Sequence, residues 1–525
     1  MRILVEQIKT PISSTDEDIF EMAKTRILKT RVFSNISKQY IYKRSIDARH
    51  NDDIKFVSTV CAEVEAKKGN LSLEFLASRG IKLLSSDEMD FTFKGAPISE
   101  PPLVVGFGPA GMFCALALAR AGLKPIVIER GADVESRVER VRTFYNTKRL
   151  DTETNIQFGA GGAGTFSDGK LTTRINDPKC AFVLSLLCEH GAPDDIKFKA
   201  KPHIGTDLLR NVVKGIDAEI NSLGGKVLYN TKLVSFSNNI AKTTAGNIPY
   251  SSIVLALGHS ARDTYSYLMK SGFSVAPKAF SVGVRVEHLQ ADINEAMYGK
   301  FAEDKRLGAA DYNVSYRKDG RGVYSFCMCP GGEVVCASSE ECGVVVNGMS
   351  EYARNGKNAN SAIAVQVDTN DYGTDPKKAI DFQRSLERTA FEIAGANYKA
   401  PIQTLGDFYL EKAINEPSRI APSYMDGNVS VCDLNKVLPK FVCDYLKLGF
   451  AEFGKRIKGF NANDVPITGV ETRTSAPLRI LRNDNYTAFL HPNVYPCGEG
   501  AGYAGGIMSA AVDGLNVALA ILNKQ

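Results

Sequence analysis

Three segments of the chain match the spacing G-x-G-x-x-G, in which glycines leave room for backbone amides to approach a phosphate. They are GFGPAG at residues 106–111, GAGGAG at 159–164 and GAGYAG at 500–505. Because this spacing alone is a weak signal, the flanking residues decide whether a match can bind a nucleotide.

The first match has the surroundings of a complete nucleotide-binding unit. LVV at 103–105 predicts a strand before the glycines, and MFCALALARAG at 112–122 predicts a helix after them. A second predicted strand, 125–128, ends at Glu129, where an acidic side chain would reach ribose hydroxyls. The turn and the helix N-terminus would bind a pyrophosphate. The predicted contacts are Gly106, Gly108, Pro109, Ala110, Gly111 and Glu129.

The second match predicts a loop that approaches a flat or charged group. The residues after it, TFSDGKLTTRI, do not form an apolar-periodic helix, and no strand ending in an acid follows at the required distance. Its amides and the polar side chains after it would face the bound group, and a flexible surface loop is the alternative. The residues concerned are Gly161, Gly162, Gly164, Thr165, Ser167 and Lys170.

The third match lies between a predicted strand, 493–496, and an apolar helix with no second strand after it, so a complete nucleotide-binding unit cannot form there. The helix N-terminus around Gly506 and Ile507 would point at an electron-rich group. Glu499 would be available to a ribityl or ribose hydroxyl.

Composition predicts a folded protein of two to four domains, since 44% of the 525 residues are hydrophobic. The net charge of +5 is too small to indicate a nucleic-acid-coating surface or a membrane anchor. MRILVEQIKT lacks the features of a secretory signal, and no apolar run approaches the roughly 20 residues that span a bilayer. We expect a cytoplasmic protein with a small-molecule substrate and neither a membrane nor a nucleic-acid partner.

The eleven cysteines include no C-x-x-C pair, which suits a reducing compartment. The closest group, Cys327, Cys329, Cys336 and Cys342, fits no common zinc spacing, so no metal site is predicted. The segment FCMCPGGEVVCASS predicts two strands joined at Gly331–Gly332, with the thiols acting as small apolar residues. Metal or redox-dithiol chemistry is the less favoured alternative.

Together these residues resemble the FAD-dependent oxidoreductases of the glutathione-reductase type. The resemblance implies that Glu129 and Arg130 follow the first fingerprint beside the FAD adenosine, and that a strand over 226–236 lies along the adenine. It also implies a short strand that ends in a turn at Gly258, and a C-terminal element that binds the ribityl chain and the flavin ring. The further contacts that it implies are Arg130, Val234, Gly258, Gly498, Glu499, Gly505, Gly506 and Ile507.

Four longer phrases resemble a narrower group, the bacterial FAD-dependent dehydrogenases of uncharacterised substrate. They are FGAGGAGTFSDGKL, CMCPGG, GVETRTSAPLRI and PCGEGAGYAGGIMSAAVDG. By this resemblance the 159–164 loop passes beside the flavin ring.

The predicted fold class is α/β, with a Rossmann-like FAD-binding domain built on a parallel sheet and assembled from separated segments, 98–270 and 465–525. An inserted α+β substrate domain would occupy 271–464, and a small α/β module 1–97. The oligomeric state is not predicted.

The expected function is that of a FAD-dependent oxidoreductase that transfers hydride between an organic substrate and the flavin. No second nucleotide-binding unit is evident, so NAD(P)H would dock only transiently as a co-substrate. A flavin-dependent RNA-modifying enzyme and a non-catalytic redox-sensing flavoprotein remain the alternatives.

No catalytic residue is assigned from the sequence. Four side chains in the two segments that the resemblance places near the flavin could carry a proton, although a structural or phosphate contact is more common for each: Ser167, Lys170, Glu471 and Arg473. His203, His259 and His491 are further candidate acids, because histidine titrates near neutrality, while packing is expected for Cys497.

Overall fold

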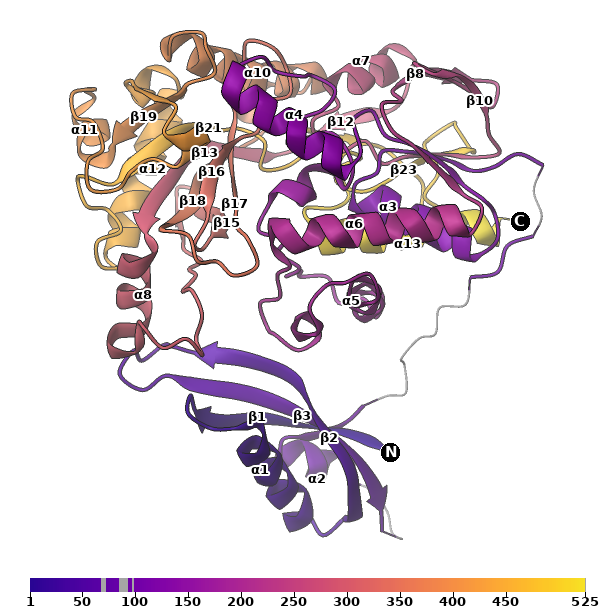
Figure 1. The fold of residues 1–525 in the computed structure, drawn as a ribbon, viewed down its shortest axis with the longest axis vertical. Coiled ribbons are helices and arrows are strands. Elements are labelled where there is room, and N and C mark those ends of the chain that lie inside the picture. Colours follow the sequence, from indigo (N-terminus) through magenta and orange to yellow (C-terminus); the bar gives the residue numbers. More distant parts are fainter. Residues whose placement is uncertain (68–71, 85–92, 97–98, 525) are drawn as a thin grey trace.

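The computed structural model describes residues 1–67, 72–84, 93–96 and 99–524. An N-terminal module lies at one end of the molecule, and the two larger sheets with their helices form the body above it (Figure 1).

The N-terminal module is a four-stranded sheet in the order β2-β3-β1-β4 with two helices. The capping residue Thr15 accepts from the amide of Asp18 and starts the first helix, whose apolar face packs on the sheet. The long β2–β3 hairpin reaches the body, where the Arg44 amide donates to the Phe198 carbonyl at 2.7 Å. The elements are β1 (Arg2–Pro11), α1 (Asp16–Lys29), β2 (Phe33–Asp47), β3 (Lys55–Ala66), α2 (Leu73–Ser78) and β4 (Ile81–Leu83).

A five-stranded parallel sheet in the order β23-β11-β5-β6-β7 forms the core of the second region. Its strands come from widely separated segments, as the sequence predicts: β5 (Leu103–Val105), β6 (Ile126–Ile128), β7 (Lys226–Leu228), β11 (Ile253–Leu255) and β23 (Val494–Pro496). Its helices are α3 (Pro109–Arg120), α4 (Val134–Thr147), α5 (Lys179–Glu189), α6 (Gly205–Ser222), α7 (Arg262–Lys270) and α13 (Ile507–Asn523). The chain is therefore mixed α/β with a parallel sheet.

The prediction of a single strand over residues 226–236 is wrong. Asn230 has a positive φ of 51° and its amide donates to the Gly131 carbonyl, so the extended chain breaks after β7. Val234 falls in a separate antiparallel sheet and is 46% exposed. That sheet contains β8 (Leu233–Ser237), β9 (Ile240–Thr243) and β10 (Gly246–Pro249).

A seven-stranded sheet in the order β14-β15-β18-β13-β21-β19-β20 forms the third region. Its central strands are fully buried and pack against helices through the largest apolar cluster. The strands are β13 (Phe280–Leu289), β14 (Ser315–Lys318), β15 (Arg321–Cys329), β18 (Asn358–Val367), β19 (Ala400–Thr404), β20 (Val429–Val431) and β21 (Pro466–Glu471). The helices are α8 (Gln290–Tyr298), α9 (Thr369–Tyr372), α10 (Pro376–Ile393), α11 (Leu405–Leu410) and α12 (Lys440–Gly454).

The inserted domain is predicted from the sequence to end at residue 464, but the seven-stranded sheet continues beyond that residue. β21 pairs with β13 and β19, so its hydrogen bonds join it to the third region. The division of the chain into three domains itself stays a prediction.

The predicted hairpin across Gly331–Gly332 is also wrong, because both edges of β15 are already bonded to β14 and β18. The strand after the glycines, β16 (Glu333–Cys336), pairs instead with β17 (Val346–Met349). The remaining elements are β12 (Val275–Pro277), β22 (Leu478–Ile480) and short 3₁₀ turns at Gly162–Phe166, Asp194–Lys197, Gly299–Phe301, Tyr424–Asp426 and Leu434–Lys436.

Within the described ranges, every helix is too short or too polar to cross a lipid bilayer.

Candidate functional site

The three glycine-rich segments meet at one place in the structure. The Gly161 amide donates to the Phe107 carbonyl at 2.8 Å, and a Cβ added to Gly162 would lie 3.0 Å from the Gly108 Cα. The third segment joins them, because a Cβ on Gly498 would lie 2.5 Å from the Ala110 Cβ. These approaches need glycine, since a side chain at Gly498 would collide with α3.

Two helices begin at this junction with free N-termini. Gly108 precedes α3 and Gly506 precedes α13, and neither cap position supplies a side-chain hydrogen bond. The first amides of both helices are thus available to an anion. A Cβ on Gly258, Gly505 or Gly506 would meet no atom within 4 Å, so these glycines border open space.

Glu129 ties the first two loops together. This residue is 5% exposed, and its carboxylate accepts hydrogen bonds of 2.9 Å from the amides of Phe107, Gly131 and Gly159. A carboxylate has about four acceptor positions, which leaves about one for a further donor. About one acceptor position of Glu129 therefore remains for the predicted contact with a ribose hydroxyl. The other three fix the backbone of both loops.

Arg137 holds the second loop, although it was not predicted from the sequence as a site residue. This α4 side chain is fully buried, and its guanidinium lies 4.8 Å from the Phe166 ring centroid. It donates at 2.7–2.9 Å to the carbonyl oxygens of Asn155, Ile156, Ala160 and Gly162. Burial lowers the pKa of Arg137 to about 9.

The hydroxyls of the second loop stabilise the loop itself. Thr165 donates to the Ala160 carbonyl at 3.0 Å, and Ser167 donates to the Gly164 carbonyl at 2.7 Å. Gly164 lies against α13, because its added Cβ would contact Ile507 Cγ1 at 3.4 Å. Cofactor contacts by this loop stay a prediction.

Glu499 brings a half-buried carboxylate to the junction. No group among the described residues donates a hydrogen bond to this carboxylate, so it can accept one from a bound hydroxyl. Burial raises its pKa to about 7, an effect that Lys278 opposes and Cys327 strengthens. The available carboxylate, the two helix N-termini and the open glycine positions fit a ligand with a diphosphate and a polyhydroxyl chain, as FAD has.

Two of the sequence candidates for proton transfer lie in buried ion pairs. Lys170 pairs with Asp168 at 2.8 Å and donates to the Met328 carbonyl. Burial alone would lower the pKa of Lys170, but the charges of Asp168, Cys329 and Cys327 together outweigh it, so the pKa is raised. Glu471 forms a two-point pair with Arg285, at 3.0 and 3.2 Å.

Arg473 lies elsewhere, in a buried network at the contact between the parallel-sheet region and the seven-stranded-sheet region. It and Arg262 both pair with Glu387, at 2.8 and 2.7 Å. Burial alone would raise the pKa of Glu387, but the two guanidinium charges hold it below its ordinary range.

Two of the three histidine candidates, His203 and His259, are neutral rings at pH 7. Burial lowers the pKa of His203 to about 4 and that of His259 to about 3, so both rings are neutral. His491 stacks on Phe273 with ring centroids 4.0 Å apart. Cys497 is fully buried, and burial raises the pKa of its thiol.

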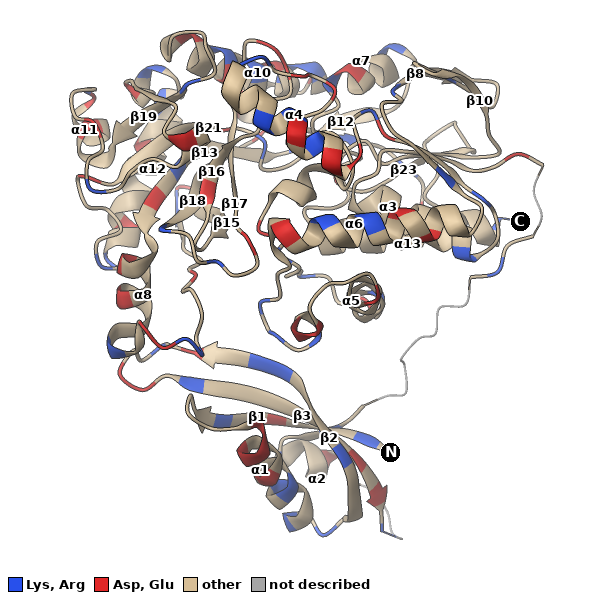
Figure 2. Cartoon of the chain, in the orientation of Figure 1, with Lys and Arg blue, Asp and Glu red and all other residues tan. Residues whose placement is uncertain are grey.

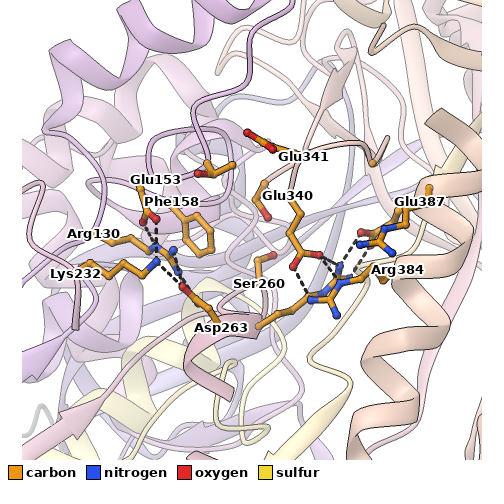
Figure 3. Close-up of a pocket in the computed structure, with 15 residues that line it drawn as sticks. Arg130, Glu153, Phe158, Lys232, Ser260, Asp263, Glu340, Glu341, Arg384 and Glu387 are labelled. Carbon is orange, nitrogen blue, oxygen red and sulfur yellow. Dashed lines mark hydrogen bonds and ion pairs between the residues drawn. The ribbon is translucent and has the colours of Figure 1, made fainter. Parts of the chain in front are cut away.

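A charged cavity of about 440 Å³ opens beside the carboxyl ends of β6 and β11. Figure 3 shows Arg130 and Lys232 reaching toward Glu153 and Asp263 on one side, with Glu340 and Arg384 paired on the other. Arg130 lies 4.1 Å from the Phe158 ring centroid. Ligands of open parallel sheets bind outside this edge of the sheet.

Replacing Arg137 with methionine should lower the free energy of unfolding by about 3–5 kcal/mol, because buried carbonyl groups lose their donor. Arg137→Lys should lose about half as much. The matched control is Arg142→Met, at an exposed position of α4, which should change stability by less than about 0.5 kcal/mol. Denaturant unfolding measures all three, and equal stability of the two methionine variants would contradict this role.

Glu499→Gln should alter how stability depends on pH. With a folded pKa of about 7, against an ordinary value of 4.5, folded wild-type protein holds an extra proton between these pH values, so stability from this group falls as pH rises through that window. The cofactor-free variant should match wild type near pH 4.5 and exceed it at pH 8 by about 3 kcal/mol. The control is the exposed Glu341→Gln, and parallel curves for wild type and Glu499→Gln would contradict the assignment.

Comparison with known proteins bears on family membership. Residues 279–474 match the family model described as "FAD-dependent protein, C-terminal domain-like". The structure is similar to that of aklavinone-11 hydroxylase with FAD and aklavinone, at 14% identity over 82% of this chain and 63% of that chain, with a TM-score of 0.33. It is also similar to that of L-proline dehydrogenase from P. horikoshii, at 13% identity over 82% of this chain and 95% of that chain, with a TM-score of 0.34.

Another protein is much more similar to this chain in sequence than these two. An uncharacterized protein of Clostridium beijerinckii is 47% identical over 521 residues, which cover 97% of each chain. At this identity and coverage, the chain belongs to the same protein family as that clostridial protein.

Proposed function

We propose that this protein is a FAD-dependent oxidoreductase that transfers hydride between a small organic substrate and the flavin. The observation that carries the proposal is the convergence of three glycine-rich segments on two uncapped helix N-termini. The match of residues 279–474 to a FAD-dependent family supports a flavin oxidoreductase in general. We propose further that the FAD-binding fold is of the glutathione-reductase type and that the activity is that of a dehydrogenase.

The N-terminus of α3 would bind the pyrophosphate, because the first turn of this helix follows Gly108 without a capping side chain. Arg130 and the charged cavity would lie along the adenosine half. At the other end, Glu499 would accept from a ribityl hydroxyl, and α13 would direct its first amides at the ring.

FAD supplies a two-electron acceptor and donor when bound. The positive end of α13 would stabilise negative charge beside it and thereby favour the reduced form. Lys170 keeps its proton at neutral pH, because its pKa is raised, and it would act as a fixed cation. Glu499 is better suited to exchange a proton, since its pKa is about 7.

We place the protein in the cytoplasm, because all eleven cysteines are free, as in a reducing compartment. The substrate would be a small molecule. Basic and acidic residues are intermingled on the N-terminal module (Figure 2), and Arg44 pairs with Asp16, so this module does not favour the nucleic-acid alternative.

Gly108→Val should abolish stoichiometric FAD binding, because the new side chain would enter the space through which the pyrophosphate approaches α3. The control is Ala121→Val, at the other end of this helix. Cofactor released from each purified variant is measured by absorbance and chromatography. Full FAD content in the Gly108 variant would show that the first motif does not bind the cofactor.

NADH or NADPH should bleach the oxidised flavin band under anaerobic conditions if a pyridine nucleotide docks transiently as a co-substrate. Anaerobic absorbance spectra before and after each addition measure this. A band that persists with both would remove NAD(P)H from the proposal and leave another electron donor or acceptor.

A further inference from the structure

A second cavity, of about 500 Å³, opens at the C-terminal half of α13. It lies between this helix, β23 and the loop that joins β22 to β23. Asn516, the first helix residue that lines it, follows Gly506 by about 15 Å along the helix axis. The cavity is therefore separate from the glycine junction, and it is large enough for a small-molecule ligand.

One stripe of α13 forms a wall of this cavity. Asn516, Leu519, Ala520 and Asn523 lie on the same face of the helix, because their spacing follows its turns. The middle of the stripe is apolar, and an amide stands at each end. Within residues 1–67, 72–84, 93–96 and 99–524, neither amide side chain has a hydrogen-bond partner. Both amides can therefore bind a solute.

Tyr495 of β23 contributes a hydroxyl to the cavity. The residue is 1% exposed, and no group in the described part of the chain forms a hydrogen bond with its hydroxyl. That oxygen is not among the fully enclosed polar atoms, so the small accessible part of the side chain includes it. Buried tyrosine hydroxyls normally have a partner, which indicates that this one is available to a molecule in the cavity.

A rigid turn holds the ring of Tyr486 at the cavity. Tyr486 has a φ of 68°, which is rare for a bulky side chain. The turn is closed by hydrogen bonds from the Tyr486 amide to the Asn483 carbonyl at 2.9 Å and from the Asn483 amide to the Thr487 carbonyl at 2.8 Å. Arg482, paired with Asp513 at 2.7 Å, lies 4.6 Å from the ring centroid. Strained residues that are fixed in this way cluster at ligand sites.

The interior of the cavity is neutral. Its charged lining residues, Asp484 and Lys524, are both exposed. Lys524 donates to the Pro492 carbonyl at 2.8 Å and to the Asn493 side chain at 3.0 Å. An uncharged, flat group fits such an interior, because it would stack on Tyr486 and pack on Leu519 without burying a charge. The charged cavity beside Arg130 differs in this respect.

The hydrogen-bonding groups indicate which flat ring would bind. A carboxamide presents a donor beside an acceptor, and this pattern matches the N7 acceptor and the N6 amino donor of adenine. Asn516 supplies such an amide next to Leu519. The Tyr495 hydroxyl can donate to a further ring nitrogen.

We propose that this cavity binds the adenine group of a nucleoside or nucleotide. Asn516 would pair with N6 and N7, the Tyr495 hydroxyl would donate to a second ring nitrogen, and Tyr486 would stack on the base. The proposal does not rest on the flavin assignment, because the cavity shares no lining residue with the glycine junction or the charged cavity.

The test uses the full-length protein in excess FAD, so that an adenine position in the proposed flavin site is already filled. Equilibrium dialysis with labelled adenosine, and separately with labelled AMP, measures binding. We expect saturable binding of one adenosine per chain, and inosine at least tenfold weaker, because its O6 leaves the Asn516 carbonyl oxygen without a donor. Equal affinity for AMP would identify a nucleotide as the ligand, and binding of adenosine alone would identify a nucleoside.

Two variants connect the binding to this cavity. Asn516→Leu should weaken adenosine at least tenfold, and Tyr495→Phe about fivefold or more. Both should keep the melting temperature within about 2 °C of wild type, because neither polar group has a partner in the protein. The matched control is Asn211→Leu, at an exposed position of α6, which should bind as wild type.

Absence of saturable binding of adenosine and AMP up to about 5 mM would overturn the proposal and leave a cavity filled by solvent. Binding that Asn516→Leu and Tyr495→Phe leave unchanged, or equal affinity for inosine, would also overturn it. FAD content is measured separately on the same preparations. Failure of this site is therefore distinguishable from failure of the proposed function.

Discussion

The close approach of three backbone segments at the glycine junction is the constraint on which the candidate site depends. A Cβ on Gly162 would lie 3.0 Å from the Gly108 Cα, and a Cβ on Gly498 would collide with α3. Buried charges keep this arrangement in place, because Glu129 accepts from the amides of both loops and Arg137 donates to the carbonyls of the second. Polar groups that would be costly to bury alone are thereby satisfied.

A second set of buried charges fixes the seven-stranded-sheet region against the parallel sheet. Glu387 of α10 receives guanidinium groups from Arg262 of α7 and Arg473, which follows β21. Removing one partner of such a group leaves an uncompensated charge, so the contact strongly favours one relative position of the two regions. That position encloses the charged cavity.

The sequence predicted the local elements well, because their signals are local. The strand, turn and helix around Gly108 and the start of α13 at Gly506 follow from apolar runs and glycine spacing. The break after β7 was missed, since it depends on a positive φ at Asn230 that the residue type alone does not dictate. Arg137 and the Glu387 network were missed because their partners are distant in the chain, up to 125 residues for Arg262 and Glu387.

The central claim is that one extended site takes an adenine dinucleotide flavin. The most direct test titrates cofactor-free protein with FAD and, separately, with FMN while flavin fluorescence is followed. We predict one FAD per chain and binding of FMN at least tenfold weaker, because in the proposed site the cavity beside Arg130 would contact only the adenosine half. Absence of FAD binding, or equal affinity for FMN, would contradict it.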